Sequence, residues 1–315
     1  MKFIEEFKEG DRISEIYLVK SRQSALTKAG KPYETVVLQD KTGTIDAKIW
    51  DVNSPGIGEY DTLDFVNVTG DVTNFQGTLQ FKVSRIYKAN ENDYDPADYI
   101  PVSKYDIDEM FNELMGLAGS VKNQYLNALL CSFFKDEILA KSFKNHSAAK
   151  TMHHGFVGGL LQHTLSVAKI CDFIAERYPV VNRDLLITAA ILHDIGKIDE
   201  LSAFPANNYT DDGQLLGHIV IGIIKIRERI QTIPDFPAKL ESELEHCIVA
   251  HHGELEYGSP KKPALVEAMA LNMADNLDAK LEMFTESFDN IQADNYEWLG
   301  FNRGIESNIR RTSEW

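Results

Sequence analysis

The hydrophobic pattern of this chain changes its period once, near residue 100. Before that point, apolar and polar residues alternate in short stretches, as in 44–50, where Ile45, Ala47 and Ile49 share one face. After it, apolar residues recur three and four positions apart, as in 110–117, which is the spacing of one face of a helix. A chain of 315 residues is long enough for two domains. We therefore predict a two-domain α+β protein with the strands first.

The first predicted domain spans residues 1–90 and contains five short strands separated by glycine-containing turns. Five strands of this length predict a small closed barrel of the OB type, with an SH3-like barrel as the alternative. Residues 91–100 are polar and acidic and are interpreted as a linker. Residues 101–315 are predicted to form an all-α helical bundle.

Composition and charge restrict the class of protein. Hydrophobic residues make up 43% of the chain, which is enough for a core. A membrane-spanning helix needs a run of about 18 apolar residues, and the sequence contains none. The three cysteines, Cys131, Cys171 and Cys247, lie far apart, and the first residues are acidic where a signal peptide would be apolar. These features predict a cytoplasmic protein with reduced thiols. The net charge of −16 argues against general binding of nucleic acids, so such binding requires a local basic patch or metal ions.

All nine histidines lie beyond residue 145, in the part predicted to be helical. The pair His193-Asp194 ends the apolar stretch 185–190, and Asp275 lies in a stretch that is apolar nearly all round. Such groups are costly to bury unless they are paired or bound to a cation. With His163, His218 and His251, successive positions of this group lie 24 to 33 residues apart, so several helices would each direct one ligand inward. Imidazole and carboxylate ligands favour manganese, iron, zinc or nickel.

The order His163, then His193-Asp194, then Asp275 resembles the signature of the HD superfamily of metal-dependent phosphohydrolases, and Lys197 after the pair strengthens the match. His218 lies where two-metal members place ligands of the second ion. With a β-barrel in front, the whole chain resembles the YhaM family of OB-fold plus HD-domain enzymes, which degrade RNA from its 3′ end, typically with manganese.

The resemblance implies two divalent ions, with manganese first and iron, nickel, zinc or magnesium as alternatives. Asp194 would bridge them, and the other ligands would be His163, His193, His218, His251 and Asp275. His252 is the alternative to His251, and it and His154 are candidates to protonate the leaving oxygen. Lys197 is expected to contact phosphate.

The barrel contains one basic stretch, in which Lys20, Arg22, Lys28 and Lys31 occur without an acidic residue between them. We expect this stretch to connect the first two strands and to bind single-stranded nucleic acid, since the corresponding loop of OB-folds contributes to oligonucleotide binding. Four aromatic residues, Tyr33, Trp50, Phe75 and Phe81, are candidates to stack on bases or to fill the core.

These observations predict a 3′→5′ exoribonuclease that releases nucleoside monophosphates, with single-stranded RNA as substrate and single-stranded DNA as the alternative. Two other hypotheses stay open. One is a phosphohydrolase of a small nucleotide or cyclic dinucleotide. The other is a single-strand-binding module whose HD domain has lost its activity. The sequence leaves the oligomeric state open, including a homo-oligomer.

Overall fold

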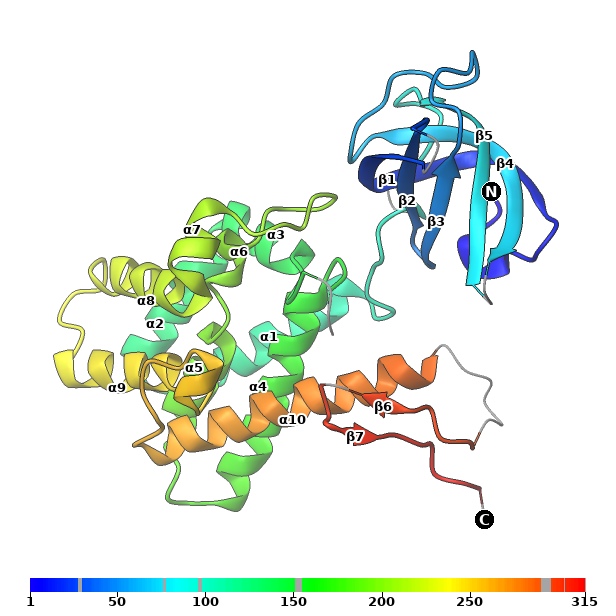
Figure 1. The fold of residues 1–315 in the computed structure, drawn as a ribbon. Coiled ribbons are helices and arrows are strands. Elements are labelled where there is room, and N and C mark those ends of the chain that lie inside the picture. Colours follow the sequence, from blue (N-terminus) through cyan, green and yellow to red (C-terminus); the bar gives the residue numbers. More distant parts are fainter. Residues whose placement is uncertain are drawn as a thin grey trace. The chain divides into compact units, whose positions relative to one another are not determined.

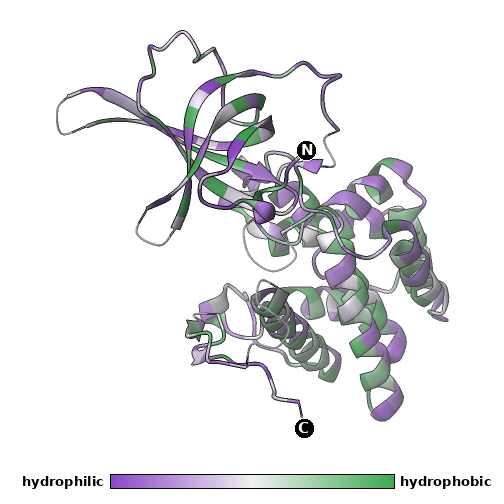
Figure 2. Cartoon of the chain, turned by 90° about the vertical axis from the view of Figure 1, so that its right-hand side faces the viewer, coloured by the Kyte–Doolittle hydropathy of each residue, from purple (hydrophilic) through white to green (hydrophobic). Residues whose placement is uncertain are grey.

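The protein was analysed as a computed structural model that describes residues 1–27, 30–75, 78–95, 98–150, 155–289, 296–302 and 304–314. It divides into two compact units, Met1–Val102 and Ser103–Trp315, each with its own hydrophobic core (Figure 1). In both units, polar and apolar residues alternate along the elements, as expected where each has one buried face (Figure 2).

The first unit is a closed five-stranded barrel with the strand order β1-β2-β3-β5-β4. Its strands are β1 (Arg12–Leu26), β2 (Pro32–Asp40), β3 (Gly43–Ile49), β4 (Phe65–Phe75) and β5 (Thr78–Lys88), after a short 3₁₀ helix, η1 (Ile4–Glu6). All neighbouring strands are antiparallel except β3 and β5, which pair in parallel. The predicted OB-like barrel is confirmed.

One long strand closes the barrel. The first half of β1 pairs with β4, and from Leu18 onward β1 pairs with β2, with a register shift between Val19 and Ser21. The predicted shared face of Ile45, Ala47 and Ile49 is confirmed, since all three point into the barrel and are at most 6% exposed.

The second unit is helical, and a short two-stranded sheet follows its last helix. Its longer helices are α1 (Ile107–Gly119), α2 (Gln124–Phe134), α3 (Glu137–Asn145), α4 (Gly159–Arg177), α5 (Arg183–Leu192), α8 (Gly217–Ile230), α9 (Ala238–Val249) and α10 (Val266–Asp289). The short elements are α6 (Lys197–Glu200), α7 (Asp211–Leu215), η3 (Leu255–Tyr257), β6 (Phe301–Asn302) and β7 (Ser307–Asn308). In Figure 1, β6 and β7 lie beside the second half of α10.

Helix α5 lies at the centre of the helical unit. Every residue from Leu185 to Leu192 is buried, and α5 contacts α1, α2, α4, α9 and α10. The side chain of Asn182 caps its first turn by accepting a hydrogen bond from the backbone N–H of Leu185. The residues that directly follow Leu192 therefore lie inside the helical unit.

Candidate metal centre

The pair His193-Asp194 follows α5 directly and is almost fully buried, at 0% and 2% exposure. The Nδ1 atom of His193 lies 2.8 Å from the carbonyl oxygen of Ala190. Since a carbonyl oxygen only accepts, Nδ1 carries the proton, and Nε2 keeps its lone pair for a ligand.

Four groups from three places in the chain converge beside this pair, and we call them the first half-site: His163 of α4, His193, Asp194 and Asp275 of α10. The Nε2 atom of His163 lies 3.3 Å from His193 Nε2, 3.4 Å from Asp194 Oδ2 and 3.2 Å from Asp275 Oδ1. The Nε2 atom of His193 lies 3.3 Å from Asp194 Oδ2. Ligand atoms about 2.0–2.2 Å from a common ion are separated by distances of this order.

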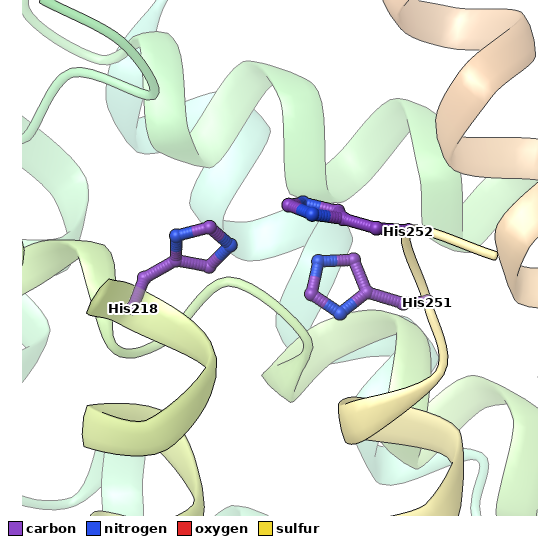
Figure 3. Close-up of side chains that lie close together, drawn as sticks. All are labelled: His218, His251 and His252. Carbon is purple, nitrogen blue, oxygen red and sulfur yellow. The ribbon is translucent and has the colours of Figure 1, made fainter. Parts of the chain in front are cut away.

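The other carboxylate oxygen of Asp194 faces a second group of histidines. Asp194 Oδ1 lies 3.5 Å from Nε2 of His218, near the start of α8, and 3.8 Å from Nε2 of His251, just after α9. We call these three residues the second half-site. His252 lies beside them, with a ring nitrogen within 4.8 Å of those of His218 and His251. Figure 3 shows the three rings converging, with His218 coming from α8 and the other two from the segment after α9.

The second half-site fits a cation. Within the described part of the chain, Asp194 Oδ1, His218 Nε2 and His251 Nε2 are buried without a hydrogen-bond partner. A buried polar atom left unpaired costs about 1–3 kcal/mol, and these three atoms lie around one point. A divalent ion there would satisfy all three, and no cysteine belongs to either of the ligand groups that the described residues form.

Two acidic residues that the sequence interpretation missed orient the histidines from outside. Asp278 Oδ2 accepts a hydrogen bond from His163 Nδ1 at 2.7 Å, and Glu200 Oε1 accepts from His218 Nδ1 at 3.0 Å and from the backbone N–H of His218 at 2.9 Å. The side chain of Glu200 is buried against His218. Asp278 lies three residues after Asp275, the spacing that puts two side chains on one helix face.

His251 completes the pattern, since its Nδ1 donates to the carbonyl oxygen of Ile248 at 2.6 Å. All four half-site histidines thus use Nδ1 for an outer hydrogen bond and direct Nε2 to the centre. Such outer hydrogen bonds fix the ring orientation and the tautomer of metal-binding histidines.

Lys197, the first residue of α6, places its Nζ atom 2.6 Å from Asp194 Oδ2. Burial lowers the pKa of Lys197, but the Asp194 carboxylate outweighs that effect and raises the pKa above its ordinary value. Burial raises the pKa of Asp194, but Lys197 and His193 outweigh it and hold the pKa well below its usual range. The centre therefore presents a carboxylate and an ammonium side by side.

Gly196 explains how α6 and α8 come close enough to bring His218 to Asp194. A Cβ atom at position 196 would lie 2.0 Å from the carbonyl oxygen of His218 and 2.7 Å from the backbone nitrogen of Gly222. Only glycine permits this approach of the two backbones.

The structure brings together all six predicted ligands, with His252 and Lys197 beside them. Of the other predicted catalytic residues, His154 lies outside the described residues. The six ligands and their roles nonetheless remain a proposal.

The basic stretch of the barrel differs from the expectation. Lys20 and Arg22 do not lie in a connecting loop, because β1 continues to Leu26 and forms a long hairpin with β2. Arg22 donates to both carboxylate oxygens of Glu34 at 2.7 and 3.1 Å and to the carbonyl oxygen of Tyr60 at 2.7 Å, so its guanidinium stabilises the barrel itself. Lys20 and Lys31 are exposed, and Lys28 lies outside the described residues.

The aromatic candidates separate into core and surface residues. Phe81 is fully buried and belongs to the barrel core. Tyr33, in β2, and Trp50, just after β3, stack with ring centroids 5.2 Å apart, and Trp50 is 52% exposed. Phe75, at the end of β4, is also exposed.

Residues 160–280 match the HD domain family, and this range contains all six predicted ligands. The second OB-fold domain of replication protein A from Methanococcus maripaludis is 21% identical over 29% of this chain and 95% of its own, with a TM-score of 0.22. A chain of a replication protein A heterotrimer bound to ssDNA is 16% identical over 28% of this chain and 65% of its own, with a TM-score of 0.22.

The helical unit therefore carries an HD domain, which together with the histidine cluster indicates a metal-dependent phosphohydrolase. None of the described helices is both long and apolar enough to cross a membrane.

Proposed function

We propose that this protein is a metal-dependent 3′→5′ exonuclease that hydrolyses single-stranded RNA to nucleoside monophosphates, with single-stranded DNA as the alternative substrate. One observation carries the proposal. The two oxygens of Asp194 face two separate groups of histidine Nε2 atoms, which is the arrangement of a carboxylate that bridges two ions. Two-ion sites are common in phosphatases, polymerases and nucleases.

In this proposal, His163, His193, Asp194 and Asp275 hold one ion, and Asp194, His218 and His251 hold the other. When bound, two divalent ions lower the pKa of a water molecule and neutralise charge on the attacking and leaving oxygens of a phosphodiester. Imidazole and carboxylate ligands suit several divalent ions. The resemblance to the YhaM family places manganese first, with iron, nickel, zinc and magnesium as alternatives.

The remaining residues handle charge and protons. Lys197 would exchange part of its contact with Asp194 for a non-bridging phosphate oxygen and so stabilise the charge that develops on the phosphoryl group. His252 lines the same pocket as Asp194 and Lys197, where it would donate a proton to the leaving 3′ oxygen.

The barrel would hold the strand. Base stacking on aromatic side chains contributes about 1–3 kcal/mol per base and tolerates any sequence. The exposed Trp50, stacked on the half-buried Tyr33, offers such a surface. The exposed Lys20 and Lys31 would add phosphate contacts. Residues 1–100 carry 12 basic and 17 acidic residues, a net charge of −5, so these contacts would be local and would not come from the charge of the barrel as a whole.

The test is hydrolysis of RNA and DNA 20-mers, labelled at the 5′ end and incubated with manganese. A ladder of 5′-labelled products that shortens one nucleotide at a time, with nucleoside monophosphates released, supports the proposal. Asp194→Asn should retain less than about a tenth of the wild-type rate, because the bridging carboxylate serves both ions. Asp199→Asn, an exposed acidic residue in α6, is the matched control and should hydrolyse at the wild-type rate. Hydrolysis of a cyclic dinucleotide without any cleavage of the strands would instead favour a small-nucleotide phosphohydrolase.

A further inference from the structure

A cavity of about 200 Å³ lies against the metal centre. Five of its lining residues are charged or carry an imidazole: His163, Asp194, Lys197, His252 and Asp275. The other lining residues are three alanines: Ala148, Ala149 and Ala279. Pockets for drug-sized ligands measure roughly 300–1,000 Å³, so this cavity suits one small unit with an anionic end and a less polar end.

Two of the alanines belong to a segment without regular structure. Residues 146–150 follow α3 and form neither helix nor strand. The backbone N–H of Leu160 donates to the carbonyl oxygen of His146 at 3.0 Å, and the residues after it are held by side-chain contacts of Asn207. We call Ala148 and Ala149 the alanine wall. A wall that shifted by an ångström would change the width of the cavity while leaving the ligands in place.

Asn207 holds the alanine wall. Its Nδ2 donates to the carbonyl oxygens of Ala149 at 3.1 Å and Lys150 at 3.3 Å, and its Oδ1 accepts from Ser147 Oγ at 2.5 Å. Asn207 is 7% exposed and adopts φ 43°, a left-handed conformation that asparagine tolerates better than most residues.

Asn207 also belongs to a loop that continues from α6. The backbone N–H of Ser202 donates to the carbonyl oxygen of Asn208 at 2.8 Å, and Ser202 Oγ accepts from the backbone N–H of Asn208 at 3.1 Å. The loop is therefore closed at its base, directly after the helix that carries Lys197. Through Asn207, the loop that follows the helix of Lys197 is tied to the alanine wall, which lines the same cavity as Lys197.

We propose that Asn207 is a positioning residue that sets the width of a nucleoside subsite, in which the sugar and base of one unpaired terminal nucleotide lie against the alanine wall. The inference rests on the proposed function for the identity of the substrate. The subsite would also explain why the enzyme takes one unpaired nucleotide at a time, because the alanine wall leaves room for a single nucleotide beside the metal centre.

The experiment compares binding of adenosine 5′-monophosphate and inorganic phosphate to manganese-loaded protein by calorimetry. Asn207→Asp keeps the acceptor for Ser147 but puts a carboxylate oxygen opposite the two carbonyl oxygens that Nδ2 now binds. We expect affinity for the nucleotide to fall by at least about tenfold, which corresponds to about 1.4 kcal/mol, and affinity for phosphate to change less than about twofold. Asn208→Asp, at the neighbouring position, is the matched control and should alter neither.

A second variant acts on the wall itself. Ala149→Leu, at a half-buried position, should also lower the affinity for the nucleotide and leave the affinity for phosphate unchanged. This variant tests the subsite if Asn207→Asp does not fold. Equal losses for both ligands, or no loss for either, would overturn the subsite. So would a wild-type protein that binds the nucleotide no better than phosphate.

The strand-cleavage assay separates this inference from the proposed function. Processive cleavage with unaltered nucleotide affinity in both variants would leave the exonuclease in place and remove the subsite. Loss of nucleotide binding in a protein that cleaves no strand would keep the subsite and remove the exonuclease.

Discussion

Asp278 and Glu200 hold two of the centre's histidines by the ring nitrogen that faces away from the ligands. An ionised carboxylate can only accept, so it keeps the proton on Nδ1 and leaves Nε2 free. Both residues are buried, and neither belongs to the proposed ligand set. A substitution at either position therefore tests the orientation of the histidine without removing a ligand of the metal.

We predict that Asp278→Asn lowers manganese affinity by about 10–100-fold, the usual cost of losing an outer hydrogen-bond partner. The amide no longer enforces one tautomer of His163. Calorimetric titration of the apoprotein with manganese measures the change. Glu282→Gln, one turn further along α10, contacts the neighbouring cavity and is the control with unchanged affinity. An Asp278→Asn protein that binds manganese like wild type would show that the hydrogen bond does not orient His163.

In the barrel, a single residue, Glu34, makes the stability of the fold depend on pH. Burial raises the pKa of Glu34, but its hydrogen bonds with Arg22 and Tyr60 outweigh burial and lower the pKa below its ordinary value of 4.5. A depressed carboxyl pKa contributes stability that is present above pH 4.5 and is lost as pH falls through the folded-state pKa.

Barrel stability in urea should therefore fall more steeply below pH 4.5 in wild type than in Glu34→Gln, which cannot titrate. Trp50 fluorescence, in a background with Trp298 and Trp315 replaced by phenylalanine, reports unfolding of the barrel. Parallel pH profiles of the two proteins would contradict this assignment.

At the level of elements, the packing of α6 on α8 decides whether the second half-site exists. The two backbones touch at Gly196, and the contact sets the distance from Asp194 to His218. Helix packing of this kind is sensitive to one added methyl group, because protein interiors have little free volume.

Gly196→Ala should destabilise the helical unit by about 1–3 kcal/mol, the usual cost of overpacking. It should also lower the manganese stoichiometry from two ions to one, because His218 moves while the first half-site stays. Gly116→Ala, inside α1 with open space around its Cβ position, is the control and should stabilise by about 0.5–1 kcal/mol. Retention of two ions in Gly196→Ala would mean that α8 adapts without losing its ligand.

For the whole molecule, the two units have separate cores, and the boundary lies after Val102. Tyr99 belongs to the barrel: it is buried, packs edge-on against Phe65, and its carbonyl oxygen accepts a hydrogen bond from Gln39 Nε2. Truncation of the chain near Tyr99 would remove these barrel contacts. Strand binding and hydrolysis are therefore better separated by surface substitutions in the full chain.

Lys20→Gln with Lys31→Gln should weaken binding of single strands and flatten its salt dependence. Two lost contacts at about 0.7 each reduce the log–log slope by about 1.4. Hydrolysis of a bis-nitrophenyl phosphate ester should be unchanged, since the ester reaches only the metal centre. Lys8→Gln with Lys88→Gln removes the same charge elsewhere on the barrel and is the control. Equal slopes for all three proteins, or a matching loss of ester hydrolysis, would mean that the barrel does not hold the strand through these lysines.

The order of elements and the group of candidate ligands followed from sequence alone, for a physical reason. Alternation and helical spacing are local, so 44–50 and α5 could be predicted without knowing their neighbours. A histidine and an aspartate at the end of an apolar helix such as α5 are costly to bury, so His193 and Asp194 indicated a cation site before any geometry was known.

The tertiary structure decided what depends on contacts between distant segments. Glu200, Asp278 and Asn207 have no distinctive local pattern, and each has its role only because folding places it against a residue 18 to 115 positions away. Arg22 looked like a free cation in sequence, yet the pairing of β1 with β2 brings its side chain close to Glu34, and the resulting ion pair stabilises the barrel. Local patterns encode which face of an element is buried, whereas the partner that meets a polar side chain is set by the fold as a whole.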